Sequence, residues 1–107
     1  MVLIQVLLPV VGSKKAPEGD PRLIETAHEL GEVFGGLTAY MRSPAKGLWT
    51  SPAGRTEEDE VVMVEVVTDR FDQTWWKQYA VSLAERFGQD VIHVRALPIE
   101  LLDPAAS

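Results

Sequence analysis

The sequence predicts an α+β sandwich in which four antiparallel strands form one sheet and two helices cover one of its faces. Short apolar runs rich in branched residues alternate with segments whose apolar residues recur at helical spacing. The order of these segments along the chain is β-α-β-β-α-β. With 107 residues, 46% of them hydrophobic and 24% charged, the chain suits one modest core. We therefore expect a single domain over 1–107, with 98–107 as its tail.

Two strands and one helix are predicted in the first part of the chain. Residues 2–8 are apolar on both faces, which is typical of a central strand. A helix is expected to begin near Pro21, because proline suits the first helical position. Its apolar stripe is followed by two glycines at residues 35–36, which are expected to end the helix. Alternating apolar and polar residues over 37–42 then indicate a second strand.

The second part of the chain contains the long excursion, two strands and the second helix. Residues 43–59 hold two prolines, two glycines and an acidic run, so we expect an irregular loop there. Residues 60–68 form a third strand that is apolar on both faces. A helix with a stripe from Trp76 to Phe87 follows, and residues 91–96 form the fourth strand.

This element order predicts the ferredoxin-like arrangement. Right-handed crossovers place both helices on one face of the sheet, and the strands then lie in the order 4-1-3-2. The first and third strands are central in that order. They are also the two strands that are apolar on both faces, which supports the same topology.

Composition excludes several classes of protein. The chain has 10 Lys+Arg against 16 Asp+Glu, a net charge of -6, and its basic residues are scattered, so we expect no nucleic-acid binding. The absence of cysteine removes disulfides and thiolate chemistry and favours a reducing, cytoplasmic location. The apolar start is interrupted by Pro9 and is too short for a membrane span, so we expect no membrane partner.

No motif names a cofactor or a metal. The chain has no glycine-rich phosphate loop, no hydrolase nucleophile elbow and no paired histidines of a zinc enzyme. The acidic run at 57–60 lacks the spacing of a calcium loop and is interpreted as a solvated charge run. We therefore expect neither a cofactor nor a metal.

Several short segments carry a resemblance to known proteins: residues 35–40, 47–49, 65–69, 75–76 and 86–90. They resemble an uncharacterised family of small bacterial proteins with a ferredoxin-like fold, and the match covers residues 2–97. The fold is also similar to the dimeric α+β barrel group, which includes small monooxygenases and lactone isomerases. Neither resemblance implies particular catalytic residues.

One face of the predicted sheet is left without helices. A period of two places these residues on it: Leu3, Gln5, Leu7, Thr38, Tyr40, Arg42, Val61, Met63, Glu65, Val67, Val91, His93 and Arg95. A monomer would expose this apolar face. Because large exposed apolar patches mark interfaces or ligand grooves, we expect a homodimer.

Glu65 and His93 are the candidate catalytic residues on this face. A carboxylate on an apolar floor must be protonated or paired. Glu65 is therefore interpreted as a general base or ligand anchor, or as the partner of Arg42 or Arg95, of the same or the other subunit, in an ion pair inside the dimer interface. His93 suits proton transfer, or a hydrogen-bonded place in an interface.

The candidate ligand-binding residues are Tyr40, Arg42, Trp49, Gln5 and Arg95. Tyr40 and Arg42 would orient an anionic group, or are ordinary edge-strand residues. Trp49 in the 43–59 loop would contact a ligand, or anchor that loop.

Three functions are compatible with these residues. The first is a homodimer that binds a small organic ligand between the open sheet face and the 43–59 loop. The second is a cofactor-free monooxygenase or isomerase of the dimeric α+β barrel type. The third is a purely structural or partner-binding module. A pocket that survives in the dimer beside Glu65 and Trp49 would favour the first two over the third.

Overall fold

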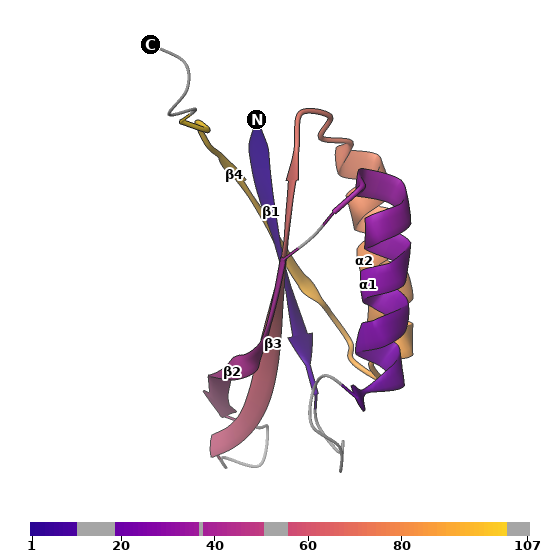
Figure 1. The fold of residues 1–107 in the computed structure, drawn as a ribbon. Coiled ribbons are helices and arrows are strands. Elements are labelled where there is room, and N and C mark those ends of the chain that lie inside the picture. The colour runs from indigo at the N-terminus through magenta and orange to yellow at the C-terminus, as the bar shows by residue number, and fades with distance from the viewer. Residues whose placement is uncertain (11–18, 37, 51–55, 103–107) are drawn as a thin grey trace.

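The computed structural model describes residues 1–10, 19–36, 38–50 and 56–102; for 39–50 and 56–60 it describes the backbone alone. Its elements, drawn in Figure 1, are β1 (Val2–Pro9), α1 (Pro21–Phe34), β2 (Thr38–Thr50), β3 (Thr56–Thr68), α2 (Gln73–Arg86) and β4 (His93–Pro98).

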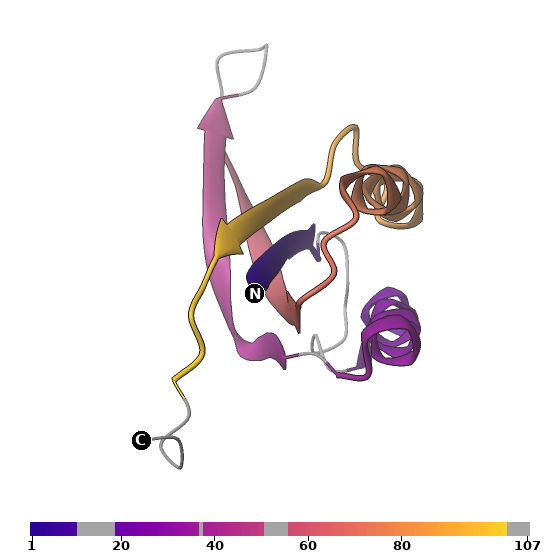
Figure 2. The same cartoon turned by 90° about the horizontal axis from the view of Figure 1, so that it is seen from above.

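The strands form one antiparallel sheet in the order β2-β3-β1-β4. Both helices lie on the same side of it, and in Figure 2 no helix of the described residues lies on the other side. The register places Gln5 of β1 between Glu65 of β3 and Arg95 of β4. These three residues therefore share one row across the sheet.

The predicted sheet was wrong in the extent of its strands. The expected loop over 43–59 is mostly strand: β2 and β3 have 13 residues each and pair from Ala45↔Val61 to Thr50↔Thr56. The sheet thus has two long and two short strands, instead of short strands around a loop. The register shifts between Tyr40 and Ala45, a stretch that contains Pro44. A proline lacks an N–H donor, which an edge strand with a bulge tolerates.

The core lies between the sheet and the helices, on the face that the period of two assigned to it. Alternate residues of the two central strands are almost fully buried, namely Ile4, Val6, Leu8, Val62, Val64 and Val66. Leu23 and Leu30 of α1 and Leu83 of α2 cover them with 1% exposure or less. Each such side chain contributes roughly 1.5–3 kcal/mol through removal from water.

Capping residues fix where the helices begin and end. Asp20 accepts a hydrogen bond from the backbone N–H of Arg22 at 2.9 Å, and Pro21 follows it at the first helical position. Gly35 ends α1 with φ 78°, a left-handed conformation that favours glycine. Asp72 caps α2 by accepting from the N–H of Trp75 at 3.1 Å.

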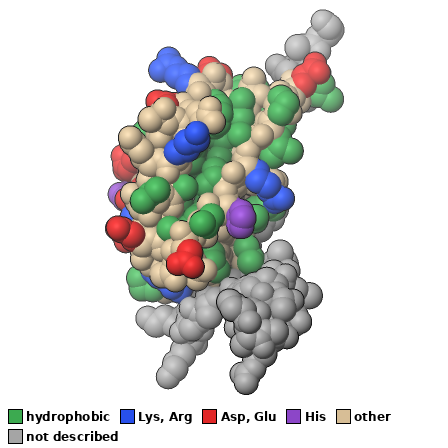
Figure 3. Space-filling view, turned by 180° about the vertical axis from the view of Figure 1, so that it is seen from behind, with side chains coloured by type: hydrophobic (Ala, Val, Ile, Leu, Met, Phe, Trp, Pro, Cys, Tyr) green, Lys and Arg blue, Asp and Glu red, His purple; other side chains and the backbone are tan. Residues whose placement is uncertain are grey.

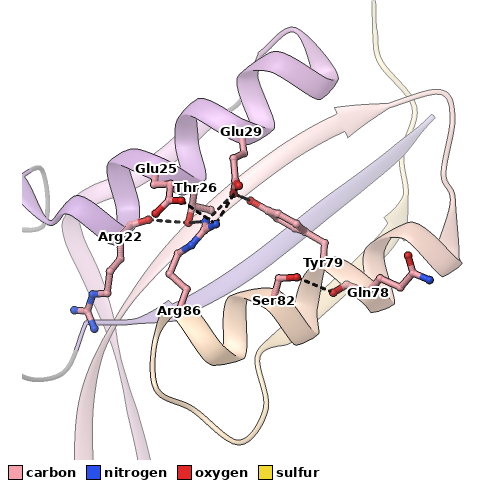
Figure 4. Close-up of polar contacts among 8 residues, drawn as sticks. All are labelled: Arg22, Glu25, Thr26, Glu29, Gln78, Tyr79, Ser82 and Arg86. Carbon is pink, nitrogen blue, oxygen red and sulfur yellow. Dashed lines mark hydrogen bonds and ion pairs between the residues drawn. The ribbon is translucent and has the colours of Figure 1, made fainter.

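Polar side chains join the two helices across the space between them (Figure 4). Arg86 of α2 donates to both carboxylate oxygens of Glu29 on α1, at 2.6 and 3.0 Å, and to Thr26 Oγ1 at 2.9 Å. The Tyr79 hydroxyl donates to the same carboxylate at 2.9 Å. Burial and the neighbouring Glu29 charge raise the pKa of Tyr79 well above its usual value, so its hydroxyl stays protonated.

Candidate functional site

The helix-free face of the sheet, called the open face below, carries apolar side chains that the single chain leaves half-covered. Those described on it are Leu3, Leu7, Val61, Met63, Val67 and Leu97. Val67 is 43% exposed and Leu97 is 41% exposed. The strand pattern predicted this division between a buried face and a half-covered face.

Glu65 lies near the middle of the open face and is held in place from the neighbouring strand. Gln5 Nε2 donates a hydrogen bond of 2.8 Å to Glu65 Oε2. Thr38 of β2 pairs with Glu65 on its other side, and Arg95 pairs with Gln5 one strand further away. Arg95 is exposed and makes no ion pair within the described part of the chain.

A hollow of about 360 Å³ lies beside Glu65, called the Glu65 hollow below. It is lined by Leu3, Phe34, Gly35, Gly36, Thr38, Glu65 and Val67. The left-handed turn at Gly35 takes the chain from α1 towards β2. Among the described residues, the hollow thus has a carboxylate and a hydroxyl beside aliphatic and aromatic side chains and glycine backbone.

Three of the candidate ligand-binding residues, Tyr40, Arg42 and Trp49, have side chains outside the described residues. Their backbone belongs to β2. Trp49 pairs with Glu57, and the eight residue steps from Glu57 to Glu65 span roughly 26 Å of extended strand. Its backbone thus lies far along the hairpin from Glu65, instead of in a loop folded over it.

His93 and Glu65 are not brought to one site. His93 is exposed and pairs with Leu7, one row along the open face from Gln5. It is not among the residues that line the Glu65 hollow. Gln5 contacts Glu65 directly, whereas Arg95 is separated from it by the β1 strand.

The sequence analysis missed Phe34, Gly35 and Gly36 as part of a site. Phe34 belongs to the apolar stripe of α1, which predicted only a core position. The two glycines predicted the end of the helix. The same turn also borders a hollow because of how β2 pairs with β3. Neither the apolar stripe nor the pair of glycines carries information about that pairing.

Two further hollows of about 340 Å³ each lie at α2. One is lined by residues at the end of α1 and the start of α2, including Phe34, Arg70, Asp72, Trp75 and Trp76. The other lies between α2 and β4, on the side where Figure 3 shows hydrophobic side chains in a band along the molecule.

Trp76 lines both of these hollows and belongs to an aromatic cluster. Its ring stacks on Phe34 with centroids 5.3 Å apart, and Trp75 meets both rings edge-on. Trp76 is 3% exposed while Trp75 is half-buried, so one of the two tryptophans enters the core, as helical geometry predicts. The buried Trp76 Nε1 has no hydrogen-bond partner among the described residues.

The described residues contain neither a metal-binding cluster nor a membrane-spanning helix. No group of three or more His, Cys, Asp or Glu residues is arranged there to hold a metal ion. Across the same part of the chain, no helix has the length and apolar character of a membrane span.

Comparisons with known proteins support the fold. No family model matches the chain, and no curated protein matches it. Among solved structures, CutA of Pyrococcus horikoshii in 3 M guanidine hydrochloride is similar with a TM-score of 0.60 and 12% identity, over 96% of this chain and 88% of that one. A CutA1 variant of the same organism has a TM-score of 0.60 and 13% identity, over 97% and 88%.

A phage SAM lyase in its apo state is also similar, with a TM-score of 0.53 and 12% identity, over 95% of this chain and 92% of that one. At such low identity these likenesses show the fold alone. The chain therefore has a small ferredoxin-like α+β fold. The comparisons do not support the resemblance to an uncharacterised bacterial family.

Proposed function

We propose that the protein is a homodimer that binds a small, partly apolar organic molecule in the Glu65 hollow. The observation that carries this proposal is the position of the Glu65 carboxylate, which Gln5 fixes at 2.8 Å on the wall of a hollow of about 360 Å³. Ligand sites commonly combine apolar side chains with a few well-placed polar groups, and this hollow combines Leu3, Phe34 and Val67 with exposed backbone and the Glu65 carboxylate.

The chemistry of the walls defines the class of ligand. A carboxylate has several acceptor positions and a negative charge, so the chemistry that suits the Glu65 wall of the hollow is an N–H or O–H donor. Leu3, Phe34 and Val67 provide contacts for a hydrocarbon or aromatic body. The preferred ligand is thus a small apolar molecule that carries an amine or a hydroxyl.

The homodimer is proposed from the open face. Its half-covered apolar residues, such as Val67 and Leu97, lose contact with water when a second copy covers them. Because His93 lies outside the Glu65 hollow, we assign binding to this site and no proton-transfer step.

The binding proposal is tested by NMR titration with benzylamine, benzyl alcohol and benzoate as matched probes. We expect saturable shifts of the backbone amides of Gly35, Gly36 and Thr38 with benzylamine, weaker shifts with the alcohol and none with benzoate. Glu65→Gln should reduce benzylamine affinity at least tenfold, and Glu85→Gln on the exposed side of α2 should leave it unchanged.

Two outcomes would overturn this assignment. In the first, the amides of Gly35, Gly36 and Thr38 do not respond to any of the three probes. In the second, Glu65→Gln binds benzylamine as tightly as the wild type does. The dimer is tested separately by light scattering. A particle of 11.8 kDa at micromolar concentration would overturn it.

A further inference from the structure

The order of residues across the open face points to how two copies would pair. We infer that the open faces of two copies pack against each other about a two-fold axis parallel to β1, so that Arg95 of the partner subunit lies over Glu65. This inference rests on the homodimer proposed above and adds its geometry and its contacting residues.

Three rows of side chains cross the open face from β3 through β1 to β4. The first row is Val67, Leu3 and Leu97; the second is Glu65, Gln5 and Arg95; the third is Met63, Leu7 and His93. The β1 residues are in the middle of each row. The central row thus has an acid on one side and a base on the other.

A two-fold axis along β1 places each row over the same row of the partner and exchanges the β3 and β4 sides. In such an interface, residue i contacts residue j and residue j contacts residue i. Val67 then faces Leu97 of the partner subunit, which joins two apolar side chains. Glu65 faces Arg95 of the partner subunit, which joins opposite charges, and both contacts occur twice.

The charges also reject the alternative axis. A two-fold axis across the strands would place Glu65 over Glu65 of the partner subunit and Arg95 over Arg95 of the partner subunit. Like charges that face each other across an interface are unfavourable. The arrangement of one acid and one base around Gln5 therefore selects the axis parallel to β1.

Exposure in the single chain agrees with this pairing. Val67 and Leu97 are 43% and 41% exposed, and the exposed Arg95 makes no ion pair within the described part of the chain. Because Glu65 lines the Glu65 hollow, the partner's Arg95 would lie at the border of that hollow. The ligand site proposed above would then be adjacent to the subunit interface.

Charge reversal tests the pairing. In Glu65→Arg alone and in Arg95→Glu alone, two like-charge contacts replace the two ion pairs, so we expect the dimer dissociation constant to rise at least tenfold in each. An equimolar mixture of the two variants should form a heterodimer of wild-type affinity, because each position again faces its opposite charge. The double variant should likewise recover the homodimer. Glu85→Arg on α2 is the control and should leave the dimer unchanged.

The outcomes separate the two proposals. A wild-type monomer would overturn the proposed dimer and this pairing together. A wild-type dimer that neither single reversal weakens would overturn the pairing alone, as would an assembly of more than twice the 11.8 kDa chain mass. Circular dichroism shows that each variant is folded; if a single variant unfolds, a folded double variant that stays monomeric would overturn the pairing.

Discussion

The guanidinium of Arg86 on α2 bridges to the carboxylate of Glu29 on α1 through two hydrogen bonds, at 2.6 and 3.0 Å. The Arg86 side chain is only 16% exposed, whereas Glu29 is 39% exposed. Arg86 therefore depends on Glu29 and Thr26 for the hydrogen bonds that water no longer supplies. This bridge joins the two helices above the core.

Removing this bridge should lower stability by a moderate amount. Arg86→Met keeps most of the apolar stem but loses the hydrogen bonds to Glu29 and Thr26, and we expect a loss of about 1–2 kcal/mol in the free energy of unfolding. The loss is moderate because water reaches the half-exposed Glu29. Urea denaturation measures it, with the exposed Lys77→Met on the same helix as control. Equal losses in the two variants would contradict the bridge.

Acid should weaken the same bridge. The hydrogen bonds from Arg86 hold the pKa of Glu29 below its usual value of 4.5. A carboxyl with a lowered pKa contributes stability that is present above the unfolded value and is lost as the pH falls through the folded value. The stability advantage of the wild type over Glu29→Gln should thus be constant near neutral pH and shrink below about pH 4.5. Urea denaturation at several pH values measures it; an advantage that grows in acid would contradict this assignment.

Local patterns of the sequence predicted the core and the helix ends because both depend on near neighbours. The two-residue period of a strand places Ile4 and Val64 on the face opposite the one that carries Glu65, wherever the strand pairs. Pro21 and Gly35 act only on the helix ends that they belong to. The predicted end of β2 was wrong because Pro44 was interpreted as the end of the strand. A proline has no N–H donor, but an edge strand needs no donor on its outer side.

Contacts between distant residues were beyond local patterns. The interaction of Arg86 with Glu29 joins residues 57 positions apart and depends on how each helix is rotated against the sheet. The hydrogen bond from Gln5 to Glu65 needs the exact register of β1 against β3. A shift by one residue would place the two side chains on opposite faces, so the pattern of either strand alone does not specify it.

The turn after α1 should tolerate a side chain at its second glycine, Gly36, but not at its first, Gly35. Gly35 has φ 78°, where a Cβ atom is strained, so Gly35→Ala should cost about 1 kcal/mol of unfolding free energy. Gly36 has no left-handed φ and nothing within 4 Å of an added Cβ, so Gly36→Ala should change stability by less than about 0.5 kcal/mol. Thermal and urea denaturation compare the two variants. A larger loss at Gly36 would contradict the assigned turn.

Trp76 should accept phenylalanine at unusually low cost for so buried a residue. Its Nε1 is buried without a partner among the described residues, and such a donor costs about 1–3 kcal/mol. Trp76→Phe removes the donor and keeps a ring against Phe34, so the gain offsets much of the lost packing. We expect a loss of less than about 1.5 kcal/mol, against about 3–5 kcal/mol for Trp76→Ala. Trp75→Phe is the control, because that ring is only half-buried. Urea denaturation measures the free energy of unfolding of the three variants. A loss for Trp76→Phe as large as the loss for Trp76→Ala would contradict this account.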